Sequence, residues 1–419
     1  MVESHANSVD DYLIEGLSFK LSPGASYVTN RRSVSFFPSG SDTYSSTTGV
    51  KVIKIKLNGT DWLDPSTVKV MFTINNTAGE MRFLSGVHSF FRRLRVVCNG
   101  QIVEDIDDYN RVCEMFNMLQ SSSVRGNDEI ESVARWDGGM PADTLAATKS
   151  RRVGMKLCSG LLNQTKMLPI RYCPLEIELE LVNAVSDPQH GSTDWNISDV
   201  QVKADLCTLD NALENSYAKH LFEGKALPIN YSTYISQSQT IVDFNFTVNV
   251  SRAVTRLKSI FMSMNGAPHS TFTNYLKEFN NFWHPMSASL VPGTYDGGKE
   301  VELHVQIGSK LYPEYPIRSA SETFSQLRKT MGIHQSPFHS VDVSAVQFRS
   351  HKFIASIDTE KVLEAGFTGL NTRAGDLLTI KVKPLDTAGM AATVPTKFFT
   401  ILHSDNILEI KESGVTVFD

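Results

Sequence analysis

One supersecondary unit occurs twice in this chain of 419 residues. In the second half, residues 301–307 alternate between apolar and polar side chains, an extended link follows, and residues 319–331 have the pattern of an amphipathic helix. In the first half, residues 94–98 alternate in the same way, "NGQIVEDI" supplies a turn and a second extended piece, and residues 108–119 predict a helix. This recurrence predicts a duplicated domain.

Both helices of the repeat have recognisable ends. Ser319 and Glu322 have the spacing of a capping box, and Gly332 is the predicted stop. Asp108 is the predicted cap of the first helix. The predicted apolar faces carry Tyr109, Val112, Cys113, Phe116 and Leu119 in the first helix, and Phe324, Leu327 and Met331 in the second.

Alternation with a period of two dominates the rest of the chain, most clearly in residues 52–57, 175–181 and 242–250. Such segments predict strands with one buried and one solvated face. Long polar connections separate several of them, which favours Greek-key sandwiches over simple meanders. The further strands that we expect cover residues 27–37, 68–75, 200–207, 257–264, 343–357, 377–382 and 398–410.

Few other helices are expected. One covers residues 210–221 and connects the two halves, so that the domain boundary falls between residues 210 and 235, and a short one follows Asp358. The predicted division of the chain is an N-terminal arm (1–25), a first β-domain (26–222) with a long loop at about residues 121–150, and a second β-domain (223–419).

Composition excludes several classes of protein. With 41% hydrophobic and 20% charged residues the chain is globular, and its length suits two domains. No apolar run is long enough for a membrane span, and "MVESHANSVDDYLIEG" lacks the features of a signal peptide. We therefore expect a protein that is made inside a cell.

The cysteines are odd in number, fall in the first half and form no CxxC pair. This pattern predicts reduced, mostly buried thiols rather than a disulfide framework or a zinc site. The five are Cys98, Cys113, Cys158, Cys173 and Cys207.

Charge gives no indication of nucleic-acid binding. The net charge is −5, and the N-terminus has no basic arm that could neutralise phosphates. The local basic clusters "FRRLR" (91–95) and "SRR" (150–152) are interpreted as solvated faces or as intersubunit salt-bridging faces.

Three motifs resemble chemical sites, and none is complete. "GTYDGGKE" matches a phosphate loop at Gly293, Gly298 and Lys299, but Glu300 replaces the magnesium-binding Ser or Thr, and a strand follows where a helix is needed. The loop histidines lack a carboxylate or cysteine at ligand spacing, and the acidic run lacks the Gly and Glu of a calcium loop. The histidines are His334, His339 and His351, and the acidic residues are Glu104, Asp105, Asp107 and Asp108.

The prediction is therefore a protein with no catalytic residues, no cofactor and no metal. One further segment, "YPEYPIRS", has two open interpretations. Pro313 and Pro316 enforce an extended path, and Tyr312 and Tyr315 supply large contact surfaces. The segment is either a buried link between strand and helix or an intersubunit contact.

These passages together resemble the double jelly-roll major capsid proteins of icosahedral double-stranded DNA viruses, notably those of polinton-like viruses, virophages and the adenovirus-like lineage. In the first half the resemblance rests on "FFRRLRVVCNGQIVEDIDDYNRVCEMFNML". In the second half it rests on "VQIGSKLYPEYPIRSASETFSQLRK" and "RSHKFIASIDTEKVLEAGFTGLNTRAGDLLTIKVKPL". It covers most of the chain and depends on the order, spacing and duplication of the patterns.

The resemblance implies an all-β fold of two tandem eight-stranded antiparallel jelly rolls with a few short helices. It implies a homotrimer of pseudo-hexameric outline that tiles an icosahedral shell in the virion, with penton and minor capsid proteins as partners. Two alternatives stay open: a two-domain carbohydrate- or protein-binding module with an aromatic-lined pocket, and a bicupin-like metalloenzyme, which the histidine spacing disfavours.

Overall fold

The structure is a computed structural model. It describes residues 27–47, 49–135, 143–266, 282–285, 300–333, 341–362, 368–373, 377–385 and 395–419. The predicted N-terminal arm, residues 1–25, lies outside the described residues.

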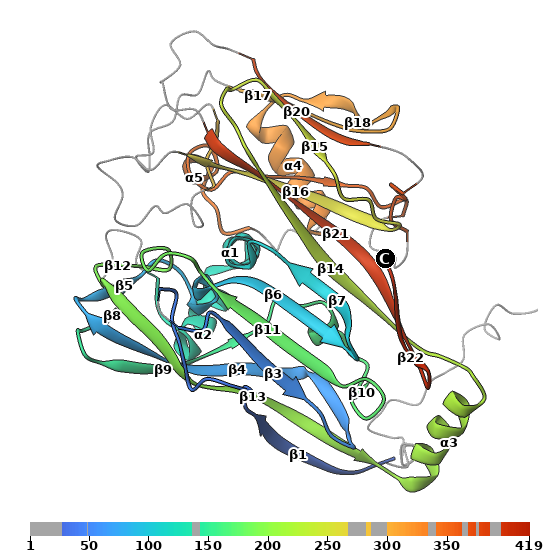
Figure 1. Ribbon diagram of the computed structural model, residues 1–419. Coiled ribbons are helices and arrows are strands. Elements are labelled where there is room, and N and C mark those ends of the chain that lie inside the picture. Colours follow the sequence, from blue (N-terminus) through green and yellow to red (C-terminus); the bar gives the residue numbers. More distant parts are fainter. Residues whose placement is uncertain are drawn as a thin grey trace, which may run out of the picture.

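The first half of the chain forms a sandwich of two sheets (Figure 1). One sheet has the order β1-β13-β4-β10, with β2 paired to β13 and β9 paired to β4, and the other has the order β3-β11-β6-β7. The strands are β1 (Val28–Phe36), β2 (Thr43–Tyr44), β3 (Val52–Leu57), β4 (Trp62–Ala78), β6 (Phe91–Cys98), β7 (Gln101–Ile106), β9 (Ser150–Lys156), β10 (Leu168–Pro169), β11 (Leu175–Leu181) and β13 (Asp194–Leu209).

The second half forms another sandwich, which lies above the first in Figure 1. Its sheets have the orders β14-β21-β16-β19, with β22 paired to β21, and β15-β20-β17-β18. The strands are β14 (Leu227–Thr240), β15 (Phe246–Val250), β16 (Leu257–Gly266), β17 (Val301–Ile307), β18 (Lys310–Ile317), β19 (Ile354–Asp358), β20 (Leu378–Pro384), β21 (Pro395–Lys411) and β22 (Gly414–Phe418).

Short elements complete the described fold. A small sheet has the order β12-β5-β8. None of the helices in the described residues is long and apolar enough to cross a membrane. These elements are β5 (Met81–Phe83), β8 (Thr144–Leu145), β12 (Gln189–His190), η3 (Val87–Phe90), η4 (Leu161–Asn163), α1 (Tyr109–Leu119), α2 (Ser122–Glu131), α3 (Asn211–Phe222), α4 (Ala320–Thr330) and α5 (Ala345–Phe348).

Strand order identifies both sandwiches as jelly rolls. In each half the first long strand of the chain pairs with the last, β1 with β13 and β14 with β21, and the second pairs with the last but one, β3 with β11 and β15 with β20. This nested antiparallel pairing is the jelly-roll topology. The all-β prediction of two tandem jelly rolls is confirmed.

The duplicated unit is also confirmed. The hairpin β6-β7 leads into α1, and the hairpin β17-β18 leads into α4. Asn99 and Gly100 form the first hairpin turn with φ values of 47° and 83°. Positive φ at both central positions matches a turn whose twist suits the flanking strands.

The helix caps differ in part from the prediction. Ser319 Oγ accepts a hydrogen bond from the Glu322 amide at 3.1 Å, as predicted. The Glu322 carboxylate, however, accepts from the Arg318 amide at 2.7 Å, so the expected reciprocal half of the box is displaced by one residue. Asp108 does occupy the N-cap position of α1, but the predicted side-chain cap is wrong: its carboxylate accepts no hydrogen bond from the helix amides, and its φ of 47° is left-handed.

Local polar groups shorten or replace some predicted strands. Within residues 343–357 only the end is strand, because Ser344 and Gln347 form a full capping box that starts α5. Strand β15 begins at Phe246 rather than at residue 242, since the Asp243 side chain accepts from the Phe244 amide at 2.6 Å and competes with strand pairing.

Two other expectations concern irregular segments. The expected loop at 121–150 contains α2, a helix without a single buried side chain and hence without an apolar sequence signal. Residues 359–362, after Asp358, are not helical, and the next five residues lie outside the described ranges.

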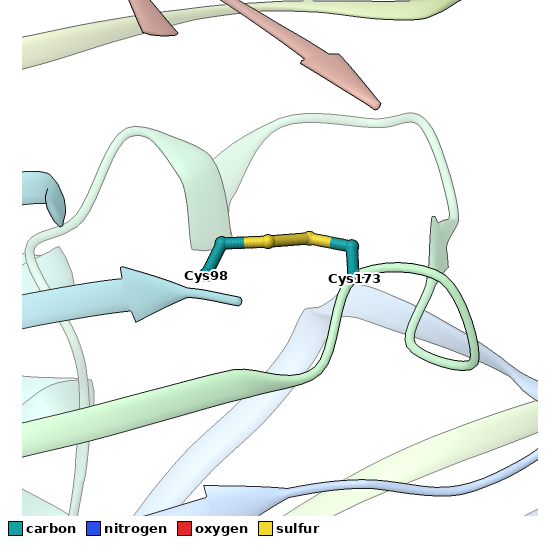
Figure 2. The surroundings of a disulfide bond; sticks show 2 residues. All are labelled: Cys98 and Cys173. Atoms are coloured by element: carbon teal, nitrogen blue, oxygen red, sulfur yellow. A yellow bond between two sulfur atoms is a disulfide. The ribbon is translucent and has the colours of Figure 1, made fainter. Parts of the chain in front are cut away.

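The expectation of five reduced thiols is wrong for one pair. Cys98 and Cys173 form a disulfide, with Cys98 at the end of β6 and Cys173 in the loop before β11 (Figure 2). Strand pairing explains this, because Cys98 lies opposite Leu175 in the β6-β11 ladder, two residues from Cys173. The other three cysteines have free thiols; Cys113 and Cys207 are buried and Cys158 is half-buried.

The Ser319 cap yields a test of the repeated unit. We expect Ser319→Ala to lower the free energy of unfolding by about 1 kcal/mol, because the Glu322 amide loses its acceptor. Ser121→Ala is the matched control, since Ser121 precedes α2 without a side-chain cap bond. Urea denaturation measures both; equal losses in the two variants would contradict the assignment of the cap.

Candidate functional site: the junction between the two sandwiches

Helix α1 lies between the two sandwiches (Figure 1). Most of its side chains are buried, and they include the charged residues Arg111 and Glu114. A charge is buried at tolerable free energy only when partners surround it. We use "the junction" for α1, β7 and residues 158–162 of the first half, together with the parts of β14, β16 and β21 and the residue Phe282 that face them.

Arg111 connects α1 to the second sandwich. Its side chain is 1% exposed, and Nη2 donates to the Ser263 hydroxyl and the Met264 carbonyl, both at 3.3 Å. The guanidinium carbon lies 4.5 Å from the ring centre of Phe282 and 4.1 Å from that of Phe399. A planar cation between two rings gains both dispersion and cation–π attraction.

Apolar contacts continue the junction one turn later along α1. The ring of Phe116 lies 4.7 Å from that of Tyr234 in β14 and 5.4 Å from that of Phe261 in β16. Tyr234 in turn stacks on His403, whose pKa burial lowers to about 4, so the imidazole is neutral at physiological pH. The buried hydrophobic residues of the two halves consequently form one cluster.

The two backbones approach each other closely at Gly160. A Cβ atom on this residue would lie 1.4 Å from the Ser232 carbonyl oxygen of β14, far inside any contact distance. Next to it, the Tyr231 hydroxyl donates to the Val103 carbonyl of β7 at 2.9 Å. Only glycine permits this packing of the first sandwich against β14.

Glu104 organises the first-half side of that approach. Its carboxylate accepts from the Gly160 amide at 2.9 Å and from the Ser159 hydroxyl. The side chain is almost fully buried, and this burial raises its pKa while the hydrogen bonds oppose the shift. Glu104 thus fixes the 159–161 turn to β7, beside β14.

Glu114 is the second buried carboxylate. Arg135 donates to it at 2.6 Å, His88 lies 3.2 Å away, and the Ser85 hydroxyl also donates. Burial alone would raise its pKa, but Arg135, His88 and Ser85 outweigh burial, and the pKa is lowered. The carboxylate is therefore ionised and fixes α1 to the first sandwich.

An ion pair at the rim of the junction joins α2 to the second half. Arg125 of α2 pairs with Asp342. Lys352 lies nearby and is 8% exposed; burial, with Arg135 and Arg125, lowers its pKa to about 8. The rim thus combines charges of both halves.

The sequence motifs that resemble chemical sites form no shared site at the junction among the described residues. Residues 293–299 of the phosphate-loop candidate, and His334 and His339, lie outside the described residues. Glu300 accepts from the Ala320 amide at the start of α4. His351 is buried, and burial beside Lys352 and Arg135 lowers its pKa to about 4. Within the described ranges, no group of three His, Cys, Asp or Glu residues could hold a metal ion.

Most arginines of the basic clusters form ion pairs within the chain, partly with the acidic run. Arg93 binds Asp105 through two hydrogen bonds of 2.7 Å, and Arg95 donates to Glu178 at 3.0 Å. Arg152 of "SRR" pairs with Asp199. These intrachain pairs suit the interpretation of the clusters as solvated faces, while the alternative of intersubunit salt bridges stays a prediction.

"YPEYPIRS" forms the edge strand β18 rather than a buried link. Tyr312 is half-buried against the core, whereas Tyr315 is 56% exposed. Two cavities among the described residues, of about 420 and 480 Å³, contain Phe116 as their only Phe, Tyr or Trp. Neither cavity has the aromatic lining that is expected of a carbohydrate-binding pocket.

Sequence reasoning missed the junction. Gly160 follows no turn pattern, and its need for a bare Cα arises only from the other half of the chain. Arg111 had a usable signal, since Arg111 and Glu114 are charged residues within the otherwise mostly apolar predicted helix 108–119, where burial requires partners from elsewhere in the fold.

Comparisons with known proteins identify the fold. No protein-family model and no curated protein sequence match the chain. Among solved structures, VP54 of PBCV-1, fitted into a reconstruction of the virophage Sputnik, has a TM-score of 0.65 at 11% identity, covering 96% of this chain and 99% of that chain. The Faustovirus major capsid protein has a TM-score of 0.57 at 8% identity, covering 96% and 93% respectively.

The mavirus major capsid protein has a TM-score of 0.51 at 10% identity, and the alignment covers 100% of this chain and 95% of that chain. This chain has the double jelly-roll fold. Because the alignments run nearly end to end in both partners, the order and the number of the two sandwiches are shared as well as their local topology.

The close approach at Gly160 predicts a large steric effect. We expect Gly160→Ala to lower the free energy of unfolding by about 3 kcal/mol, because the added methyl group forces β14 and the 159–161 turn apart. Gly126→Ala is the control: this helical glycine has no atom within 4 Å of its Cβ position, and the change stabilises by about 0.5 kcal/mol. Chemical denaturation of both variants checks this, and a neutral Gly160→Ala would contradict the packing.

Glu114 predicts a pH-dependent stability. Its folded pKa is lowered, so its pairing stabilises the protein above the ordinary glutamate pKa, and this contribution is lost as the pH falls through the folded pKa. We expect Glu114→Gln to cost about 3 kcal/mol at neutral pH and progressively less as the pH falls below the ordinary glutamate pKa of about 4.3.

The control is Glu223→Gln, which removes an exposed pair with Lys225 and leaves the neutral-pH denaturation midpoint unchanged. Denaturation midpoints across this pH range measure both variants. A Glu114→Gln penalty that stays constant with pH would show that the carboxylate charge has no part in the effect.

Proposed function

We propose that this protein is the major capsid protein of an icosahedral double-stranded DNA virus and acts as a homotrimer of pseudo-hexameric outline that tiles the shell. The observation that carries the proposal is the end-to-end match of the double jelly roll to the Faustovirus and mavirus major capsid proteins. The role is structural rather than enzymatic, and the protein resides in the virion.

The rigidity of the junction is a physical argument for the proposed trimer. A trimer with six-fold outline needs six similar blocks, and each chain contributes two sandwiches. The two blocks of one chain have to keep a fixed spacing. If they moved relative to each other, the contacts with neighbouring subunits could not form at the same positions in every copy. Three features supply that rigidity: the hydrogen bonds of Arg111, the close contact between Gly160 and β14, and the buried cluster shared by both halves.

Strand β18, at the edge of its sheet, is suited to subunit contacts made by side chains rather than by backbone pairing. In β18, Pro313 and Pro316 lack amide protons, so a neighbouring strand cannot pair along this edge. Tyr315 remains exposed beside them. We assign this segment to a subunit contact made by side chains, in line with the enrichment of tyrosine at interfaces.

The shell would contact its genome without specific binding. The net charge is −5, and Arg93, Arg95 and Arg152 are paired within the chain, so no basic surface arises from them. Penton and minor capsid proteins are the expected partners. We propose the same division of the chain as before: an arm at 1–25, a first jelly roll at 26–222 and a second at 223–419.

The mass of the purified protein in solution tests the proposal. Light scattering should give about three times the 46.5 kDa chain mass, and negative-stain images of the same peak should show a hexagonal outline. A monodisperse monomer at micromolar concentration would contradict a self-sufficient trimer and would favour the binding-module alternative.

A further inference from the structure

Two free thiols line one cavity beside helix α1. The cavity has a volume of about 420 Å³ and lies among α1, α2 and the end of β9. Both Cys113, from α1, and Cys158, two residues beyond β9, line it. The remaining free thiol, Cys207 of β13, does not line this cavity.

Tyr109 shows that the two thiols share one location. Tyr109 and Cys113 lie four residues apart on α1 and therefore on one face of the helix. The Cys158 amide donates to the Tyr109 hydroxyl at 2.9 Å, which brings Cys158 against that face. Burial, and after it the Cys158 side chain, raises the pKa of Cys113, which is consistent with the two side chains lying next to each other.

We propose that Cys113 and Cys158 are a site of reversible oxidation, at which a small-molecule disulfide such as glutathione disulfide joins them in a second intrachain disulfide. The Cys158 thiolate attacks one glutathione sulfur, which forms a mixed disulfide and releases one glutathione thiolate. The Cys113 thiolate then attacks the Cys158 sulfur and releases the second. Two electrons pass to the glutathione disulfide, and the two protein protons end on the two glutathione thiols.

The two cysteines differ in their exposure to solvent. Cys158 is half-buried and Cys113 is 9% exposed, and burial raises the pKa of the Cys113 thiol. Exchange therefore begins at Cys158, and Cys113 completes it within the protein. Helix α2, which borders the cavity, buries none of its side chains, so its displacement costs little apolar burial.

The new bond would fasten α1 to the first sandwich. Helix α1 carries Arg111 into the second sandwich, so the linkage adds a covalent connection on the first-half side of the junction. It is separate from the Cys98–Cys173 disulfide, which joins β6 to the loop before β11. The inference is independent of the capsid proposal, because it concerns the folded single chain.

The test compares the wild-type protein with Cys158→Ser, Cys113→Ser and the control Cys207→Ser. Each is incubated with glutathione disulfide, mapped by mass spectrometry under non-reducing conditions and heated to its unfolding temperature. We expect a linked Cys113–Cys158 peptide in the wild type and in Cys207→Ser, with an unfolding temperature raised by about 5 °C. Neither change should occur in Cys158→Ser or Cys113→Ser.

Peptide mapping of the wild type decides the matter even where a variant folds poorly. A glutathione adduct that persists on Cys158 without linkage to Cys113 would overturn the proposal. So would two thiols that stay reduced while Cys98 and Cys173 remain linked.

Discussion

The junction between the two sandwiches depends on a backbone contact that only glycine allows. The space between Gly160 and the Ser232 carbonyl is too small for a methyl group, so the two halves approach to the distance at which Arg111 reaches the Met264 carbonyl and Phe116 meets the rings of β14 and β16. With a side chain at this position, these contacts would lengthen together. One missing side chain therefore sets the spacing of two domains.

Buried charge makes that spacing specific. Apolar surfaces alone slide past one another at small cost, whereas Glu104, Arg111 and Glu114 are each surrounded by donors, acceptors or rings in one arrangement only. Buried polar networks contribute less to net stability than to the choice of one geometry, since every displaced arrangement leaves a charge without partners. For the shell role proposed above, this selectivity matters more than extra stability.

The sequence predicted the repeated domain but not the contacts that join the two sandwiches. Alternation located the cores of most long strands but missed β14 and β9, and the repeated hairpin and helix showed the duplication. Both signals are local, because each depends on residues only a few positions apart in the chain. Local polar competition shortened β15 and introduced α5, where Asp243 and Ser344 outweigh apolar periodicity. The Cys98–Cys173 bond, the Gly160 contact and the cavity thiols come from residues that are distant in sequence, and their meeting is a product of strand order.

Strand order also governs when each half can form during synthesis. The first strand of each jelly roll pairs with the last, Val28 opposite Leu209 and Leu227 opposite Ile410. The first sandwich cannot close before its final strand has left the ribosome, and the second waits for nearly the whole chain. Such long-range pairing is slow, and β14 stays without its partner β21 throughout that interval. The completed first sandwich, which already presents Gly160 and α1, then offers a surface on which the emerging β14 can settle before β21 arrives.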